Sequence, residues 1–187
     1  MIGRRIVVWG ATGSGKTTLA RRLGATLGLG VVDLDEIRHA NGWDSTPYDE
    51  FREELTELLE GYSQGWVSAG SYSAIMDVYL SRADTIVWLH IPWRVSFWRV
   101  LKRTVSRAWT KEPVYENSPA RESWRLSFLS RNSILWWSIH HHRAGVRSIR
   151  RRLAELPPSI DVFELRSEED VAAFLDHLTL GARPSTS

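Results

Sequence analysis

A glycine-rich stretch of eight residues near the start of the chain constrains the fold more than any other feature. Its residues are Gly10, Ala11, Thr12, Gly13, Ser14, Gly15, Lys16 and Thr17. They fit the pattern G-x-x-x-x-G-K-[ST], the P-loop. A short apolar run, Ile6 to Trp9, precedes the stretch, and leucines at positions 19, 23 and 27 follow it at helical spacing. The motif therefore has the strand before it and the helix after it that a phosphate-binding loop requires.

Each part of this motif has a chemical role in holding a nucleotide. Glycines let backbone N–H groups converge on phosphate oxygens, and the N-terminus of the following helix adds positive potential. Lys16 can reach the β- and γ-phosphates, and the Thr17 hydroxyl can ligate Mg²⁺. Together with Thr18, the loop predicts that the chain binds ATP or GTP with Mg²⁺.

The rest of the chain alternates between short apolar runs and amphipathic segments. Strands are predicted near residues 6–9, 31–32, 66–67, 85–91 and 160–165, with helices between them and a loop at 111–119. The predicted buried helix faces are Phe51, Leu55, Leu58, Leu59 and Tyr62, then Trp93, Phe97, Val100, Leu101 and Val105, and later Trp124, Phe128, Leu135 and Ile139. This alternation predicts an α/β fold with a parallel sheet covered on both faces, in a single domain of residues 1–187.

Composition excludes several classes of site. The 187 residues include no cysteine, which rules out disulfides, thiolate metal sites and cysteine nucleophiles. No apolar stretch approaches the roughly 20 residues that span a membrane, so we expect a cytoplasmic protein with no membrane partner.

Positive charge is concentrated in residues 94–152. This range holds fourteen Arg and Lys against three Glu, which indicates an anionic partner and makes nucleic acid a candidate. The run from Arg150 to Arg152 is interpreted as a solvated helix end.

Two acids follow the second predicted strand. Asp33 and Asp35 lie two positions apart, which on a strand would direct both carboxylates to one face. They could hold hydrated Mg²⁺ or accept a proton from an attacking hydroxyl. The alternative is a solvated turn with a helix N-cap. We favour Asp33 for the metal and Asp35 for contact with a substrate.

The chain also resembles the adenylate-kinase-like P-loop proteins, most closely the bacterial branch called DNA topology modulation protein or small AAA-family ATPase. The matching stretches include the P-loop, Leu34-Asp35, Gly70-Ser71-Tyr72, Ala83 to Leu89 and Arg99 to Thr104. The resemblance implies a three-layer fold with a five-stranded parallel sheet and a helical lid at about residues 106–142. It also implies that lid arginines neutralise the transferring phosphoryl group; the candidates are Arg99 and Arg103 at the lid base, with Arg121, Arg125 and Arg131 in the lid.

Two positions depart from this resemblance. The third strand of such relatives usually ends in Asp-Gly-Asn-Tyr, but here the residues are Ala69 to Tyr72, so the acid is missing. After the fourth strand, His90 stands where an Asp is common; it could contact an anionic acceptor or simply pack. Gly70 and Ser71 remain suited to close approach by a substrate.

Three functions fit these observations. The first is an ATP-dependent phosphotransferase acting on a small acceptor, with a nucleoside or nucleotide favoured by fold analogy. Its predicted catalytic residues are Lys16, Asp35, Arg103, Arg121 and Arg125, and its acceptor contacts are Asp35, Gly70, Ser71 and Arg99. The second is a nucleic-acid-associated NTPase or polynucleotide end-kinase using the basic region. The third is a non-catalytic nucleotide sensor.

Overall fold

The computed structural model describes residues 2–40, 46–110 and 134–181 and contains one five-stranded sheet. All the pairings are parallel, and the strand order is β2-β3-β1-β4-β5. The strands are β1 (Arg5–Gly10), β2 (Gly30–Asp33), β3 (Trp66–Ala69), β4 (Thr85–Leu89) and β5 (Asp161–Leu165). The five-stranded parallel sheet expected from the sequence is therefore confirmed.

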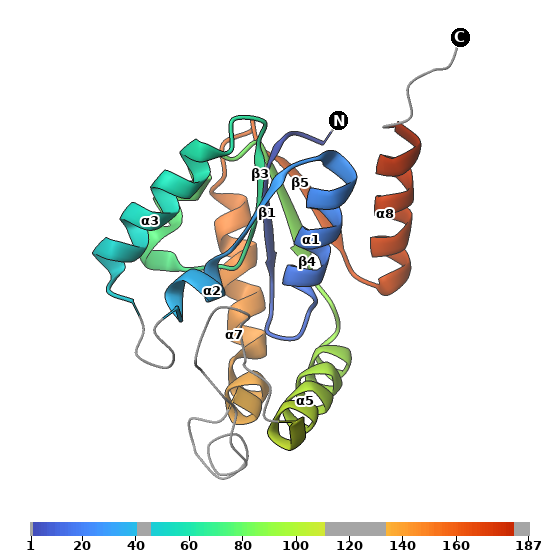
Figure 1. Cartoon of the computed structure of the whole chain (residues 1–187). Coiled ribbons are helices and arrows are strands. Elements are labelled where there is room, and N and C mark those ends of the chain that lie inside the picture. The colour runs from blue at the N-terminus through green and yellow to red at the C-terminus, as the bar shows by residue number, and fades with distance from the viewer. Residues whose placement is uncertain (1, 41–45, 111–133, 182–187) are drawn as a thin grey trace.

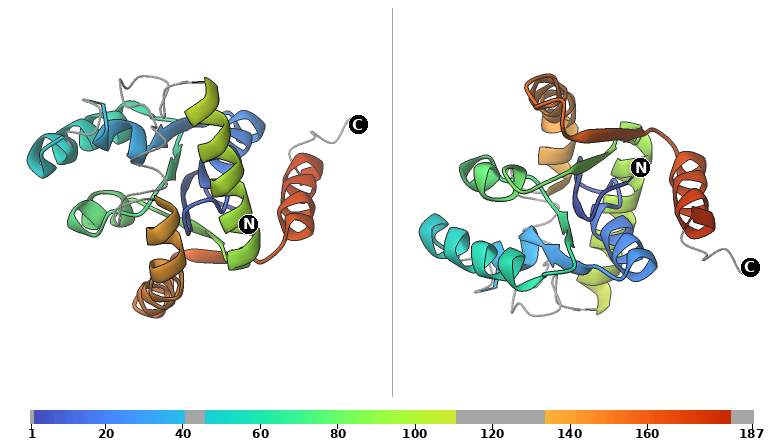
Figure 2. Two further views of the ribbon diagram at one scale, coloured as in Figure 1. Left: turned by 90° about the horizontal axis from the view of Figure 1, so that it is seen from below. Right: turned by 90° about the horizontal axis from the view of Figure 1, so that it is seen from above.

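Helices cover both faces of this sheet. They are α1 (Lys16–Leu27), α2 (Leu34–Arg38), α3 (Tyr48–Gly61), α4 (Met76–Leu80), α5 (Trp93–Thr110), α7 (Ile134–Ala154) and α8 (Glu168–Gly181), with a short 3₁₀ helix, η1 (Ser73–Ile75), before α4. Figures 1 and 2 show α1 and α8 on one side of the strands, and α3 and α7 on the other. The three layers predicted for the fold are present.

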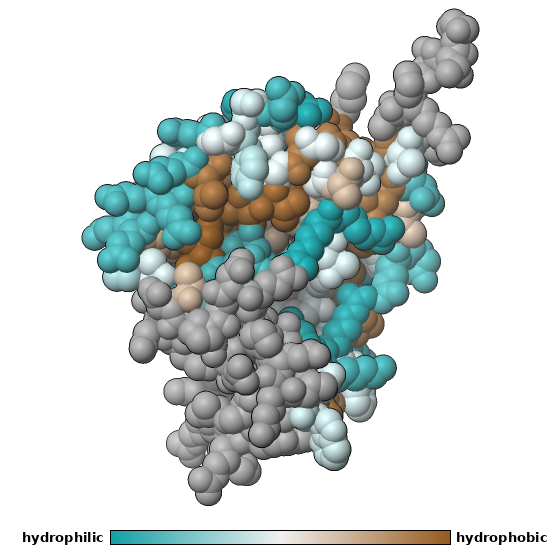
Figure 3. All heavy atoms as spheres, viewed as in Figure 1, coloured by the Kyte–Doolittle hydropathy of each residue, from teal (hydrophilic) through white to brown (hydrophobic). Residues whose placement is uncertain are grey.

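Two apolar cores hold the layers together because successive strand residues face opposite sides. On β1, Val7 and Trp9 pack toward α3, α4 and α7, whereas Ile6 and Val8 pack toward α1 and α8. All four side chains are fully buried. Runs such as Ile6–Trp9 are apolar without alternation because each face of the sheet is covered. The outer surface of α3, in contrast, is hydrophilic (Figure 3).

Most predicted helix faces are confirmed, with two errors. Phe51, Leu55 and Val100 are fully buried. Tyr62 is 37% exposed because α3 ends at Gly61 and Tyr62 only caps it, and Val105 is 39% exposed because it lies on the face of α5 away from Val100. The predicted loop at 111–119, the positions Trp124 and Phe128, and most of the predicted lid fall outside the described residues.

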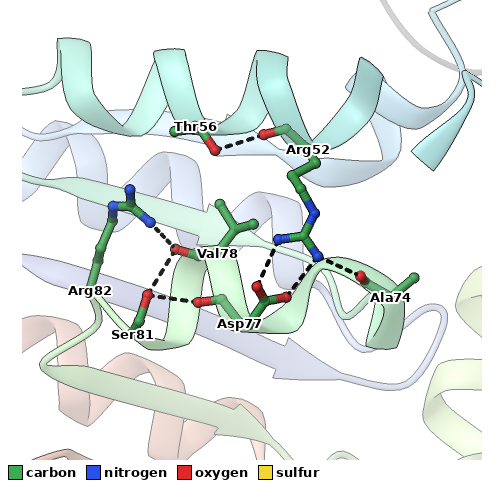
Figure 4. A network of polar contacts seen from close by, with 7 residues as sticks. All are labelled: Arg52, Thr56, Ala74, Asp77, Val78, Ser81 and Arg82. Atoms are coloured by element: carbon green, nitrogen blue, oxygen red, sulfur yellow. Dashed lines mark hydrogen bonds and ion pairs between the residues drawn. The ribbon is translucent and has the colours of Figure 1, made fainter. Parts of the chain in front are cut away.

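A polar network joins α3 to the segment that follows β3 (Figure 4). The Arg52 guanidinium donates to both carboxylate oxygens of Asp77, at 2.7 and 3.0 Å, and to the carbonyl oxygen of Ala74 at 3.1 Å. Ser81 in turn donates to the Asp77 carbonyl oxygen at 2.7 Å. Because these charges are exposed, the network contributes little to stability, although it links α3 to η1 and α4.

The register of the sheet brings distant segments to one edge. Gly10 pairs with Leu89, and Ala69 pairs with both Val8 and Asp33. The carboxyl ends of β1, β2 and β3 therefore meet at the edge where ligands of open parallel sheets bind. None of the helices in the described ranges is long and apolar enough to cross a membrane.

Two helical glycines give a matched test of this packing. A Cβ at Gly24 in α1 would lie 2.3 Å from Val31 Cγ2 and 3.1 Å from the Leu29 carbonyl oxygen, whereas a Cβ at Gly61 would meet nothing within 4 Å. Gly24→Ala should lower the free energy of unfolding by about 1–3 kcal/mol through overpacking. Gly61→Ala should leave it unchanged or raise it by up to ~1 kcal/mol. Urea denaturation measures both, and equal effects would contradict the packing of α1 against β2.

Candidate active site

The P-loop wraps between the end of β1 and the start of α1. Gly13 and Gly15 have φ values of +79° and +98°, which residues with a Cβ rarely adopt. A Cβ at Gly13 would also lie 2.4 Å from the Ser96 carbonyl oxygen on α5. The loop thus has the open backbone cradle at a helix N-terminus that a phosphate chain requires.

Lys16 lies at the centre of the charged groups. Its Nζ donates to the Ala11 carbonyl oxygen at 3.2 Å. Burial lowers the pKa of the ammonium below its ordinary value of 10.5, while the nearby carboxylates of Asp35 and Asp33 favour the charged form. Arg103 is also close enough to affect Lys16 electrostatically. The predicted catalytic residues Lys16, Asp35 and Arg103 therefore lie around one site.

A chain of hydrogen bonds links the P-loop to the segment after β3. The Thr17 hydroxyl donates to Asp33 Oδ2 at 2.8 Å, and the Asp35 backbone N–H donates to Asp33 Oδ1 at 3.0 Å. The Tyr72 hydroxyl then donates to Asp35 Oδ1 at 2.6 Å. Asp33 is thus both the N-cap of α2 and the partner of Thr17, so the two interpretations of this acid are compatible.

The positions of the two acids differ from the strand geometry assumed above. The chain enters α2 directly after Asp33, so Asp35 lies in the first helical turn rather than on a strand. The side chains nevertheless converge, because both act on Lys16. Thr17 and Asp33 supply adjacent oxygen donors, which suits Mg²⁺. Burial raises the pKa of the Asp33 carboxyl above its ordinary value of 3.8, although the Thr17 hydrogen bond opposes this shift.

The segment after β3 approaches the same edge of the sheet. Gly70 has a φ of +131°, and a Cβ there would lie 2.9 Å from Leu34 Cβ. Ser71, which follows, accepts a hydrogen bond from Arg152 at 3.2 Å, and Ser73 accepts one from the same guanidinium at 2.6 Å. The basic run predicted a solvated helix end, but Arg152 on α7 contacts two serine hydroxyls. This contact could not be predicted from the sequence, because it joins residues about 80 positions apart.

A buried tyrosine lies beneath these groups. Burial raises the pKa of Tyr79 to about 12, so its hydroxyl stays protonated at physiological pH. The Trp9 indole, Ser71 and Arg152 are near enough to influence it electrostatically. The Tyr79 hydroxyl and the Trp9 indole nitrogen nevertheless have no hydrogen bond of normal geometry within the described ranges.

On the face of the sheet that α1 and α8 cover, a pocket of 590 Å³ opens beside the P-loop. Its lining includes Ser14, Gly15, Thr18, Leu89, Arg99 and Glu168. Arg99 donates to the Ser14 carbonyl oxygen at 3.2 Å and forms an ion pair with Glu168 of α8. Arg99, expected to contact the acceptor, therefore has its contacts beside the P-loop and α8, whereas Asp35 and Ser71 are not among the residues that line this pocket.

The remaining predicted residues divide into three groups. Arg121, Arg125 and Arg131 fall outside the described residues. His90 is packed: its ring stacks on Trp88 with 4.4 Å between centroids, and Nδ1 lies 2.6 Å from Glu164 Oε1. Ala69 is 1% exposed and belongs to the core beside α1.

Comparison with known proteins gives a consistent assignment. A profile of the shikimate kinase family matches residues 12–144, which include Lys16, both acids and Arg103. The chain belongs to the shikimate kinase family. A shikimate kinase of Paramagnetospirillum magneticum is 32% identical over 136 residues, which cover 65% of this chain and 66% of that relative, just under two thirds of its length.

Solved structures support the fold alone. A shikimate kinase from Bacteroides thetaiotaomicron has a TM-score of 0.52 at 17% identity, with 94% of this chain and 96% of that one covered. A candidate kinase from Chloroflexus aurantiacus has a TM-score of 0.54 at 14% identity, with 95% and 97% covered. The family is one of P-loop kinases, which confirms the adenylate-kinase-like part of the resemblance. The finer assignment to the DNA topology modulation branch is not supported.

Asp33→Asn tests the electrostatics of the site. The raised pKa means that the folded protein binds this proton more tightly than the unfolded chain, so the wild type loses stability as pH rises above 3.8. The variant avoids this loss and should be about 1 kcal/mol more stable at pH 7 without nucleotide.

Chemical denaturation at pH 7 and near pH 4 measures this effect. The advantage of Asp33→Asn should shrink at the lower pH, and Asp176→Asn, on the exposed surface of α8, is the control. A variant less stable than the wild type at pH 7 would show that the Asp33 charge stabilises the fold.

Proposed function

We propose that the protein transfers the γ-phosphoryl group of ATP to a hydroxyl of a small hydroxylated carboxylic acid, with shikimate as the first acceptor to test. The observation that carries this proposal is the hydrogen-bonded chain from Thr17 through Asp33 to Asp35, beside Lys16. It joins a phosphate-binding loop to a carboxylate that a hydroxyl group can reach. Family membership supports the same conclusion.

On the nucleotide side, the residues fit Mg·ATP. The P-loop backbone, from Gly10 to Thr18, would hold the phosphates, and Lys16 would neutralise charge on the β- and γ-oxygens. Thr17 and Asp33 would hold Mg²⁺, directly or through water. The 590 Å³ pocket that Thr18 and Arg99 line would take the base. ATP would supply the phosphoryl group, and ADP would be the leaving group.

On the acceptor side, Asp35 would orient the hydroxyl and accept its proton. The acceptor oxygen forms a bond to the γ-phosphorus as the bond to the bridging β–γ oxygen breaks, and ADP keeps those electrons. Lys16 and Arg103 would oppose the charge that spreads over the phosphoryl oxygens, which is the largest demand of this reaction.

Arg152 favours an acid as the acceptor over a nucleoside. Its guanidinium reaches the hydroxyls of Ser71 and Ser73 at the edge where the acceptor would bind. A guanidinium and two hydroxyls form a donor-rich group, which suits a carboxylate. Arg152 lies beyond the residues matched by the family profile, so this argument rests on the structure.

Two other functions remain as alternatives. The nucleic-acid-associated NTPase has no support from the relatives found. The non-catalytic sensor is favoured only by Ala69, where relatives of the resembled branch carry an acid. Asp33 pairs with Ala69 across the sheet and supplies a carboxylate at the same edge.

A single assay separates these functions. Pure protein with Mg·ATP should form ADP when shikimate or related hydroxy acids are present, because only these acceptors satisfy both Asp35 and Arg152. Nucleosides and short single-stranded DNA or RNA should add nothing above the rate without acceptor. Lys16→Ala is the blank. Tight ATP binding with no ADP under any condition would support the sensor instead.

Arg152→Gln tests the acceptor site. Loss of a charged hydrogen-bond donor should raise the acceptor KM by roughly tenfold to a hundredfold while ATP affinity stays the same. Steady-state kinetics measure the first, and titration with a fluorescent ATP analogue measures the second. Arg151→Gln, on an exposed neighbour, is the matched control. Equal acceptor KM values for the two variants would show that Arg152 does not contact the acceptor.

A further inference from the structure

Asp35, the proposed proton acceptor, is held by a residue that the proposed function does not yet use. Tyr72 donates its hydroxyl to Asp35 Oδ1 at 2.6 Å, a short distance typical of a hydrogen bond to a charged oxygen. The second oxygen, Asp35 Oδ2, has no hydrogen-bond partner among the residues that the structure describes. One oxygen is thus fixed by the protein and the other is available.

The position of Tyr72 is itself strongly determined. Its ring packs edge-on against Phe51, with 5.3 Å between centroids and an interplanar angle of 86°, and it joins the core beneath α3. Gly70, two positions before Tyr72, is tied to β1, because its backbone N–H donates to the Val8 carbonyl oxygen at 3.3 Å. Phe51 is fully buried. The hydroxyl therefore reaches Asp35 from a rigid support rather than from a free loop.

The backbone of Asp35 is fixed from the opposite side. Its N–H donates to Asp33 Oδ1, which ties it to Thr17 and the phosphate loop. The Asp side chain has two torsions, and a hydrogen bond to one of its carboxylate oxygens restricts both. Tyr72 supplies that bond, which narrows the range of directions that Asp35 Oδ2 can take relative to the P-loop.

We propose, on the basis of the proposed function, that Tyr72 is a positioning residue that orients the Asp35 carboxylate for proton transfer from the acceptor hydroxyl. Tyr72 does not itself touch the reacting atoms. Orientation of a general base acts on the transition state more than on ground-state binding, so its loss lowers kcat more than it raises KM.

Tyr72→Phe removes the hydroxyl and keeps the ring that packs on Phe51. We expect kcat to fall about tenfold, part of the hundredfold or more that a general base contributes, with acceptor KM changed less than threefold. Affinity for the fluorescent ATP analogue should not change. Tyr62→Phe is the matched control, since Tyr62 lies at the far end of α3 beside Gly30.

A second measurement does not depend on turnover. The free energies of unfolding of Tyr72→Phe, Asp35→Asn and the double variant form a cycle, and a direct hydrogen bond makes the two single effects non-additive. Additive effects would show that the contact is not made in solution and would overturn the proposal.

The kinetic outcomes are also decisive. An active wild type with an unchanged kcat in Tyr72→Phe overturns the role of Tyr72 alone. A lower acceptor KM with an unchanged kcat overturns it too, because the tyrosine would then compete with the acceptor for Asp35. If the wild type phosphorylates no acceptor, the proposed function fails and this role fails with it, although the stability cycle still reports the contact.

Discussion

The hydrogen bond between Thr17 and Asp33 joins the two parts of this site. Thr17 lies in the first turn of the helix that follows the phosphate loop, and Asp33 ends the edge strand and caps the next helix. One carboxylate therefore sets the distance between the groups that would hold phosphate and those that would hold an acceptor. The parallel register makes this possible, because it ends β1, β2 and β3 at the same edge.

This arrangement has an electrostatic cost that the site partly offsets. Lys16 and Asp33 are both buried enough to disfavour their charged forms. Each lowers the cost for the other, since a positive and a negative group lie within interaction range. The Thr17 hydroxyl and the Asp35 backbone N–H complete the hydrogen bonding of Asp33. The fold thus tolerates the charges that the proposed phosphoryl transfer would need.

Sequence was sufficient for features that depend on local patterns. The P-loop motif predicted the loop, and apolar runs predicted all five strands, because both are set by residues close together in the chain. Prediction from sequence failed where contacts between residues far apart in the chain decide the surroundings of a side chain. Arg152 looked like part of a solvated run, yet it reaches Ser71 and Ser73, and nothing in the spacing of these residues reveals that. The ion pair between Arg99 and Glu168 of α8, which places Arg99 beside the pocket, was not predicted either, and the role of Arg99 at the acceptor stays a prediction. Tyr72 was noted only within a resemblance, because its partner Asp35 lies 37 positions away.

The regions proposed for nucleotide and acceptor lie against different cores of the same sheet. The 590 Å³ pocket is walled by Leu19, Leu89 and α8, whereas Tyr72 packs into the core beneath α3 and Arg152 comes from α7. Among the described residues, the phosphate loop lies between them: Ser14 and Gly15 line the pocket, and Thr17 is hydrogen-bonded to Asp33. If the proposed sites are right, substitutions in α8 would alter the choice of nucleotide without disturbing the acceptor, and substitutions after β3 would do the reverse. Such a division would let a lineage of enzymes acquire new acceptors while its phosphoryl donor stayed the same.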